Sequence, residues 1–440
     1  MSSPIRWVRR EIESWQHENL ISEDQAQTLL KRYPEPAASN LGLILFAGFG
    51  AVIIGLGIIL LLAYNWQAIP RGIKLAIILG SIAAAHGTGL TLIRKCQRPA
   101  LGEAICLLGT MLFGAGIWLI AQVYHIDEHY PNGLLLWSLG AMALAWTLPS
   151  LSHATLAAVL VTTWCGMEAF NFHRPMHAGP LILAGWIGLL ALKQKSRFLL
   201  SISIPALFLS TLFVLVGTPG YSHAHGGLII SGLLNFGIAL VALSYLFPRF
   251  RFFESATPIL GFYGRLIALG ILYLLTFPQV ADDLLRSSWA TAALPIKLYY
   301  IAFLALSIAL WLRIATDVRI RFSERPPFDQ WIYPFTAVVV ALYAFLPTAD
   351  WDGWVVAIPF NLAFLALIIA LMTRGCCQGR LGSTVAGALL LLLLTFSRYF
   401  DLFGSLLVRG LLFILIGVAI FIQGLVYHRA KRRKGEDQTP

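Results

Sequence analysis

The chain has 440 residues, of which 58% are hydrophobic and 12% are charged, and its formal net charge is +11. Soluble domains carry about a quarter charged residues, so a chain this apolar does not fit a soluble fold and is expected to lie in a membrane. The positive charge does not indicate nucleic-acid binding, because the basic residues are spread over short loops and form no contiguous basic stretch with interleaved aromatic residues.

The beginning of the chain predicts a small helical hairpin over residues 3–33. Ser22 and Gln25 have the spacing of a capping box, which starts a second helix after a turn at Asn19. Asparagine is one of the few residues that readily takes the left-handed backbone such a turn needs. We expect residues 1–40 to form a cytoplasmic hairpin that docks on the membrane domain, on the lipid surface or on a protein partner.

Residues 41–427 are predicted to form an all-α, polytopic transmembrane bundle of about fourteen helices, each near the roughly 20 residues that cross a bilayer. Two of these segments, 133–148 and 178–192, are short enough to be re-entrant or tilted helices instead, which would change the count. The predicted spans are 41–64, 73–93, 102–121, 133–148, 153–170, 178–192, 198–216, 227–247, 256–277, 294–312, 330–346, 353–373, 381–397 and 405–427.

The loops between these spans alternate in charge. Most of the basic residues fall in every second loop, in the N-terminal hairpin and in the basic tail at 428–440, whereas the other loops hold mainly aspartate and glutamate. Basic loops face the cytoplasm under the positive-inside rule. We therefore expect both termini to be cytoplasmic and the chain to be a multi-pass protein with the lipid bilayer as its surroundings.

Two sequence blocks carry a family resemblance. Trp15–Leu30 reads WQHENLISEDQAQTLL, and Gly114–Ile126 reads GAGIWLIAQVYHI, followed by PNGLLLW at 131–137. These blocks resemble the DUF2157 family of predicted bacterial membrane proteins, and the likeness covers roughly residues 5–150. At Asn19 the family pattern has glycine, a departure that asparagine tolerates. The resemblance implies a protein of the bacterial inner membrane and supplies no mechanism.

Ionisable groups at membrane depth are costly and mark functional sites by default. The densest polar set follows the third predicted span and comprises Gln122, Tyr124, His125, Asp127, Glu128 and His129. In a site facing the periplasm, His125 would exchange protons near neutral pH. Asp127 or Glu128 would act as a base or a cation ligand, and Gln122 would orient a polar group. The alternative is an ordinary interfacial loop at the level of the lipid head groups.

A second polar set lies at the outer end of the thirteenth predicted span and comprises Arg398, Asp401 and Arg409. Arg398 and Asp401 are one helical turn apart, which predicts a structural ion pair. The alternative is an anion site in which Arg398 and Arg409 present their guanidinium groups to a phosphate or carboxylate. Both polar sets are predicted on the same side of the membrane, so they can belong to one site.

Single polar residues inside the predicted spans form a third group. Arg265 lies too deep in its span to reach the membrane surface comfortably and should have a partner, for which Glu103 and Glu168 are the available acids. Such a pair is either structural or part of a transport relay. The candidate intramembrane residues are His86, Glu103, Glu168, Asn235 and Arg265.

The sequence lacks the Walker A, G-x-S-x-G, H-E-x-x-H and Cys-x-x-Cys motifs. We expect no metal and no cofactor, and whether the chain is an enzyme stays open. The first hypothesis is a transporter-like protein that binds or moves a polar or anionic solute through a cavity near 122–128 and 398–409. The second is a membrane-embedded enzyme of envelope assembly that handles a lipid-linked sugar or a phospholipid. The third is a scaffold that recruits a partner through residues 3–33.

Overall fold

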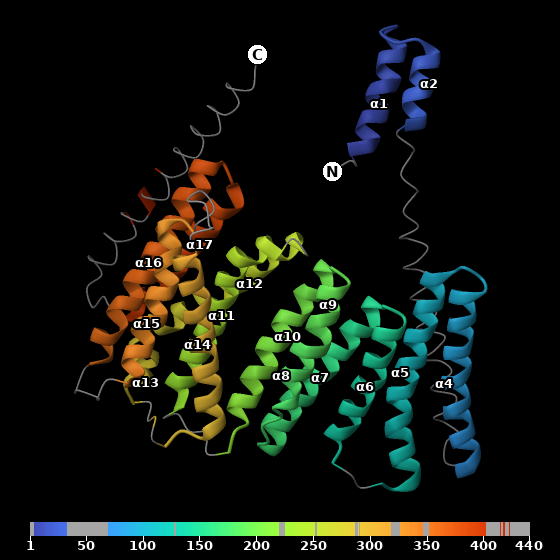
Figure 1. The fold of residues 1–440 in the computed structure, drawn as a ribbon, viewed down its shortest axis with the longest axis horizontal. Helices are drawn as coiled ribbons and strands as arrows, with labels where there is room; N and C mark the ends of the chain where they lie inside the picture. The colour runs from blue at the N-terminus through green and yellow to red at the C-terminus, as the bar shows by residue number, and fades with distance from the viewer. Residues whose placement is uncertain are drawn as a thin grey trace. The chain divides into compact units, whose positions relative to one another are not determined.

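The computed structural model describes residues 4–32, 69–126, 129–219, 225–250, 253–286, 289, 291–317, 326–345 and 352–401, together with 414, 417, 418 and 422. The chain divides into two compact units, residues 1–77 and 78–440, which are treated separately below. Within the described residues the regular structure is entirely helical, in agreement with the predicted all-α class. The ribbon is shown in Figure 1.

The first unit contains the predicted hairpin, formed by α1 (Pro4–His17) and α2 (Glu23–Arg32). The capping box is present in both directions: the Ser22 N–H donates to Gln25 Oε1 at 3.0 Å, and the Gln25 N–H donates to Ser22 Oγ at 3.3 Å. Ile12 and Ala26 are buried between the two helices. Asn19 has a φ of 56°, so the predicted left-handed turn is confirmed.

The left-handed backbone at Asn19 makes a prediction about this hairpin. Asn19→Gly is expected to leave it as stable as before, because glycine adopts positive φ without strain. Asn19→Val is expected to lower its stability by about 1–2 kcal/mol, because a side chain branched at Cβ strains a left-handed residue. Hydrogen exchange of the amides in residues 4–32 of the full chain measures the difference. Leu20→Val, at the exposed neighbouring position, is the control that should change little.

The described helices beyond the hairpin run in chain order with short connections. The helix α4 (Arg71–Arg94) spans the boundary of the two units, and all later helices lie in the second unit. They are α5 (Pro99–Tyr124), α6 (Pro131–Thr147), α7 (Leu151–Phe172), α8 (Ala178–Ile182), the π-helical turn η2 (Leu183–Gly188), α9 (Leu189–Lys193), α10 (Arg197–Val216), α11 (Gly226–Leu246), η4 (Phe247–Phe250), η5 (Glu254–Ala256), α12 (Thr257–Leu275), α13 (Pro278–Arg286), α14 (Leu294–Thr316), η7 (Phe328–Trp331), α15 (Ile332–Phe345), α16 (Gly353–Gln378) and α17 (Leu381–Asp401).

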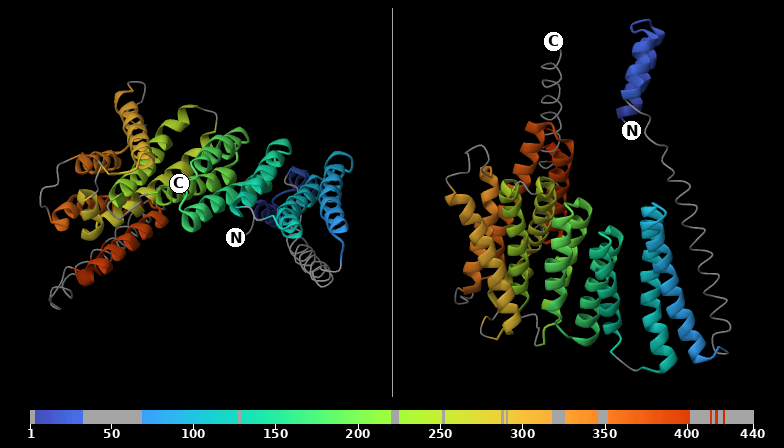
Figure 2. Two further views of the ribbon diagram at one scale, coloured as in Figure 1. Left: turned by 90° about the horizontal axis from the view of Figure 1, so that it is seen from below. Right: turned by 45° about the vertical axis from the view of Figure 1, so that its right-hand side comes forward.

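The helix α11 lies at the centre of the second unit and is buried along almost its whole length. It packs against α12, α14, α13 and α15, and it joins two apolar clusters. One cluster gathers residues of α6, α7, α10 and the N-terminal part of α12, and the other gathers residues from α11 to α17. Two further views show α5, α6, α7 and α10 following one another in chain order toward α11 (Figure 2).

Seven helices in the described part of the chain are long and apolar enough to cross a bilayer: α4, α5, α10, α11, the continuous stretch Glu254–Leu275, α14 and α16. The predicted spans 178–192 and 381–397 form shorter apolar helices. Spans 41–64 and, for the most part, 405–427 lie outside the described residues. The structure therefore confirms several apolar helices in the predicted places but does not confirm fourteen spans.

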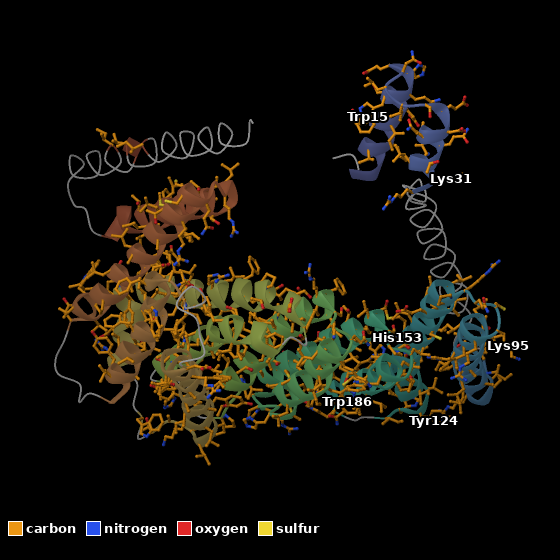
Figure 3. The ribbon with its side chains drawn as sticks, turned by 45° about the horizontal axis from the view of Figure 1, so that its top comes forward. Trp15, Lys31, Lys95, Tyr124, His153 and Trp186 are labelled. Atoms are coloured by element: carbon orange, nitrogen blue, oxygen red, sulfur yellow. The ribbon has the colours of Figure 1, made fainter. Side chains whose placement is uncertain are left out.

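Successive long helices run in opposite directions, so their connections alternate between two ends (Figure 1). One end carries Lys95, Lys195 and Arg380 in the connections after α4, α9 and α16, and we call it the basic end. The opposite end carries the connections after α5 and α7. In Figure 3 Lys95 and His153 lie toward the basic end and Tyr124 lies at the opposite end.

The helix α13, in a predicted loop, is the main element that the sequence analysis missed. It has nine residues, far fewer than a span needs, and its Ala281 and Leu284 are buried against the neighbouring helices α11 and α16. Its polar face carries an ion pair between Arg286 and Asp282. A short amphipathic helix of this kind has no long apolar run, so hydropathy does not distinguish it from a loop.

Candidate functional site

The most buried ion pair in the described residues lies at the end opposite the basic end. The His129 Nε2 atom is 2.7 Å from Glu168 Oε1, and the side chains are 21% and 1% exposed. His129 lies just before the first residue of α6, whereas Glu168 lies in the last turns of α7. In the described part of the chain the second carboxylate oxygen, Oε2, is buried without a hydrogen-bond partner. The carboxylate therefore depends on this one histidine.

Aromatic and amide side chains fix the position of the histidine. The His129 ring meets the Phe172 ring edge-on, with centroids 4.2 Å apart. Tyr130, the next residue, packs on the same Phe172, and its hydroxyl accepts a hydrogen bond of 2.7 Å from Asn171 Nδ2. Both contacts come from the C-terminal end of α7. The two helices α6 and α7 thus hold the imidazole in one orientation.

His129 also lines a groove of about 910 Å³ that runs between α5 and α6, which we call the α5–α6 groove. Its walls are mainly apolar and aromatic, and its polar residues lie toward the end that contains His129. The apolar lining includes Phe113, Ile117, Trp118 and Leu136, and the polar lining includes Gln122, His125, His129, Tyr130 and Asn132. A site of this composition suits a ligand with an apolar body and one polar end.

Glycines of α5 determine how closely the neighbouring helices pack beside this groove. The Trp137 ring lies directly over Gly114, where an added Cβ would come within 2.2 Å of the indole, and the indole N–H donates to the Thr110 carbonyl oxygen at 2.8 Å. On another face of α5, Gly109 meets the ring of His86. The glycines of α5 therefore allow side chains of the neighbouring helices to approach its backbone closely.

The structure places part of the first predicted polar set around this groove. Gln122 and His125 line it, and His125 ends α5 with a left-handed backbone, whereas Tyr124 is exposed beside it. Asp127 and Glu128 lie outside the described residues. The acid that the structure brings to His129 is Glu168, which the sequence analysis had placed among the intramembrane residues.

The second predicted polar set is only partly described. Arg398 and Asp401 lie in the last turns of α17, but their side chains are outside the described part, as is the whole of Arg409. The backbone does not bring this segment to the groove, because α17 packs on α16 whereas α5 packs on α6 (Figure 1). The candidate site therefore rests on the first set alone.

Glu103 belongs to a separate polar cluster toward the basic end. Ser150, which precedes α7, donates to Glu103 Oε1 at 2.5 Å. The same hydroxyl is 2.7 Å from His153 Nδ1 and caps the helix by accepting the His153 backbone N–H. The ring of His86, in α4, contacts Gly109 and Thr110 of α5. These contacts tie α4, α5 and α7 together.

Two further intramembrane candidates, Asn235 and Arg265, lie in α11 and α12. Asn235 is fully buried in α11 and donates to the Ser231 carbonyl oxygen of its own helix at 2.9 Å. Arg265 was expected to pair with Glu103 or Glu168, and this is wrong. Glu103 is bonded to Ser150 and Glu168 to His129, whereas Arg265 lines a different cavity near the basic end.

Sequence reasoning had no means of pairing His129 with Glu168. The two residues are 39 positions apart, and they meet only because α6 and α7 pack against each other. The signal in the sequence was position, because His129 and Glu168 lie at the same end of two neighbouring predicted spans. Ser150 and His153 had a local signal, since serine before a helix is a common N-cap.

A chain whose described regular structure is all helical, with several helices long and apolar enough to cross a bilayer, is a multi-helix membrane protein. Residues 13–154 match a family model described as a predicted membrane protein, DUF2157, so the resemblance read from Trp15–Leu30 and Gly114–Ile126 is confirmed. The matched part includes the α5–α6 groove and His129, but not Glu168. No curated protein and no solved structure matches the chain.

Proposed function

We propose that this chain is a transporter-like protein of the bacterial inner membrane that binds a membrane-embedded amphiphile in the α5–α6 groove. The observation that carries the proposal is the composition of the groove, which has apolar walls and one polar end beside the His129–Glu168 pair. An acyl or prenyl chain would lie along Trp118 and Leu136. The polar head group would contact Gln122, His125 and His129.

The His129–Glu168 pair gives the polar end its chemistry. An imidazole held by a buried carboxylate either donates a proton to a head-group oxygen or accepts one from it. Because Glu168 is buried and His129 is partly exposed and lines the groove, His129 is the member of the pair that a head group would contact. In a transporter-like role this pair would recognise the head group.

The orientation in the membrane is part of the proposal. In the described part of the second unit, most of the basic residues lie in or next to the helix ends at the basic end, including Lys95, Lys195 and Arg380. The positive-inside rule places that end at the cytoplasmic surface. The polar end of the groove then faces the periplasm, at the level of the outer lipid head groups.

A second candidate, an enzyme acting on a lipid-linked sugar or phospholipid, is favoured by one observation. A histidine oriented by a buried carboxylate is the arrangement that general bases commonly have. His129 would then remove a proton from a hydroxyl of the substrate or of water, at the mouth of the groove. The two candidate functions use the same ligand. A transporter would release it unchanged, whereas an enzyme would release it chemically altered.

The proposal is tested with a phospholipid that carries a photoreactive group in its acyl chain, added to the purified full chain in detergent. Cross-links are expected on residues 113–136, and Trp118→Ala should reduce them several-fold. Trp186→Ala is the matched control, because Trp186 is similarly exposed (41% against 37%) but does not line the groove. Figure 3 labels Trp186.

Two results decide the proposal and its second candidate. Equal cross-linking of the wild type and Trp118→Ala would exclude the groove as the lipid site. Mass spectrometry of the lipid after incubation then separates the candidates. An unchanged phospholipid supports a binding or transport role, whereas a cleaved or transferred head group supports the enzyme.

A further inference from the structure

A second polar cavity, of about 260 Å³, lies near the basic end among α12, η7, α15, α16 and α17. Three arginines line it: Arg265 from α12, Arg374 from α16, and Arg380 from the connection between α16 and α17. Among the described residues, Asp329, in η7, is the only carboxylate that lines it. The lining side chains therefore carry two more positive than negative charges.

The charges in this cavity are not evenly paired. Arg374 forms an ion pair with Asp329, and the two side chains are 32% and 20% exposed. Among the described residues, neither Arg265 nor Arg380 has an ion-pair partner. Arg265 lies about two turns into α12, where an unpaired charge is expensive. A bound anion would compensate it.

A chain of hydrogen bonds holds Arg374 in place. The Tyr245 hydroxyl donates to Gln330 Oε1 at 3.3 Å, and Gln330 Nε2 donates to Asp329 Oδ2 at 3.0 Å. Asp329 then pairs with Arg374. Gln330, in the middle of this chain, is only 5% exposed and so is shielded from water. The Asp329 carboxylate is thus paired with Arg374 and does not neutralise Arg265 or Arg380.

We propose that this cavity binds a phosphate-type oxyanion between Arg265, Arg374 and Arg380. A guanidinium group offers paired N–H donors that match the oxygens of a phosphate. The buried Tyr333 also lines the cavity and supplies a hydroxyl. The volume corresponds to about nine water molecules, which accommodates a phosphate group with some water rather than a large organic ligand.

The site is distinct from the α5–α6 groove, because none of its lining residues comes from α5 or α6. Two sources supply a phosphate of this kind: a free phosphate or phosphate ester in solution, and the phosphodiester of an anionic lipid. Leu269, Leu367 and Leu390 line the cavity as well, so the anion meets an apolar wall on its inner side.

The first arm of the test measures thermal unfolding of the purified full chain in detergent with increasing inorganic phosphate, against chloride at equal ionic strength. Phosphate is expected to raise the unfolding midpoint, because a ligand that binds only the folded state stabilises it. Arg265→Gln and Arg380→Gln should weaken the apparent affinity by roughly tenfold, the loss of one charge-assisted hydrogen bond. Arg380 is exposed, so its replacement does not endanger folding.

The second arm uses nanodiscs of phosphatidylglycerol and of phosphatidylcholine. Stabilisation by phosphatidylglycerol that depends on Arg265 and Arg380, without any effect of inorganic phosphate, assigns the site to a lipid phosphodiester. Stabilisation by inorganic phosphate assigns it to a soluble anion. Arg313→Gln is the matched control in both arms, because Arg313 lies in the last turn of α14 and does not line the cavity.

Two outcomes would overturn the proposal. One is that neither inorganic phosphate nor phosphatidylglycerol stabilises the wild type more than the Arg265→Gln and Arg380→Gln variants. The other is that Arg313→Gln lowers the response as much as those variants do, which would show an effect of overall charge. Arg374→Gln is not used for this decision, because it would leave Asp329 without its partner and weaken the fold itself.

Discussion

Replacing His129 with alanine is expected to lower the free energy of unfolding by about 3–5 kcal/mol, the loss typical when one partner of a buried ion pair is removed. Glu168 is 1% exposed, and its Oε1 is 2.7 Å from the histidine. Its Oε2 has no partner in the described part of the chain. Without His129 the carboxylate would therefore have no hydrogen bond from any described side chain.

The double variant His129→Ala/Glu168→Gln separates this cause from a loss of packing. A neutral amide is far less costly to bury than an unpaired carboxylate. Stability should return most of the way to that of Glu168→Gln alone. Unfolding by heat in detergent, followed by circular dichroism, gives the four values of the cycle. His173→Asn is a control at the same end, since His173 is exposed and asparagine tolerates its left-handed backbone.

The same cycle distinguishes a structural role from a functional one. If the double variant is stable and still retains the photoreactive phospholipid, the pair stabilises the fold and does not recognise the ligand. If it is stable but no longer retains the lipid, His129 contacts the head group, as proposed. A single variant His129→Ala that unfolds at the wild-type temperature would contradict the importance of the pair altogether.

The helices were largely predictable from the sequence because their signals are local. Ser22 and Gln25 form both bonds of their capping box, and Pro131 begins α6, as proline does at the first position of many helices. The number of spans was less predictable. The helices α6 and α15 have 17 and 14 residues, so hydropathy alone does not settle whether they cross the bilayer.

The candidate site was predictable only in part, because the partners of buried charges are set by tertiary packing. Gln122, His125 and His129 line the groove, but the acid bonded to His129 is Glu168 from another helix. The partner of Arg374 is likewise Asp329, which precedes α15 and which the hydropathy pattern places in a loop. Hydropathy shows that a charge is deep in a span and gives no information about which neighbouring element meets it.

The two polar sites share one physical origin. In each, a charged side chain inside the helices is held by a partner that lies just outside an apolar segment: His129 before α6, and Asp329 before α15. Residues at these positions bring a polar group to membrane depth without placing a charge inside the helix that follows them. Substitutions that look for further pairs of this kind should therefore begin with the residues that precede the other helices.

The second large effect is expected at Gly264, where α12 crosses α11. A Cβ on Gly264 would lie 2.6 Å from the backbone nitrogen of Val241 and 3.0 Å from the carbonyl oxygen of Gly237. Backbone atoms cannot turn aside as a side chain does, so the two helices would have to separate. Gly264→Ala is therefore expected to lower the stability by about 1–3 kcal/mol, the usual cost of overpacking a core.

Gly270 provides the matched control on the same helix. A Cβ there meets no atom within 4 Å, so Gly270→Ala should leave the stability unchanged or raise it slightly, because alanine favours helix more than glycine does. Thermal unfolding of the two variants compares them directly. Equal midpoints would show that α12 does not cross α11 as closely as the structure has it. A large loss at Gly264 alone would establish that the buried helix α11 is held by contact between the two backbones.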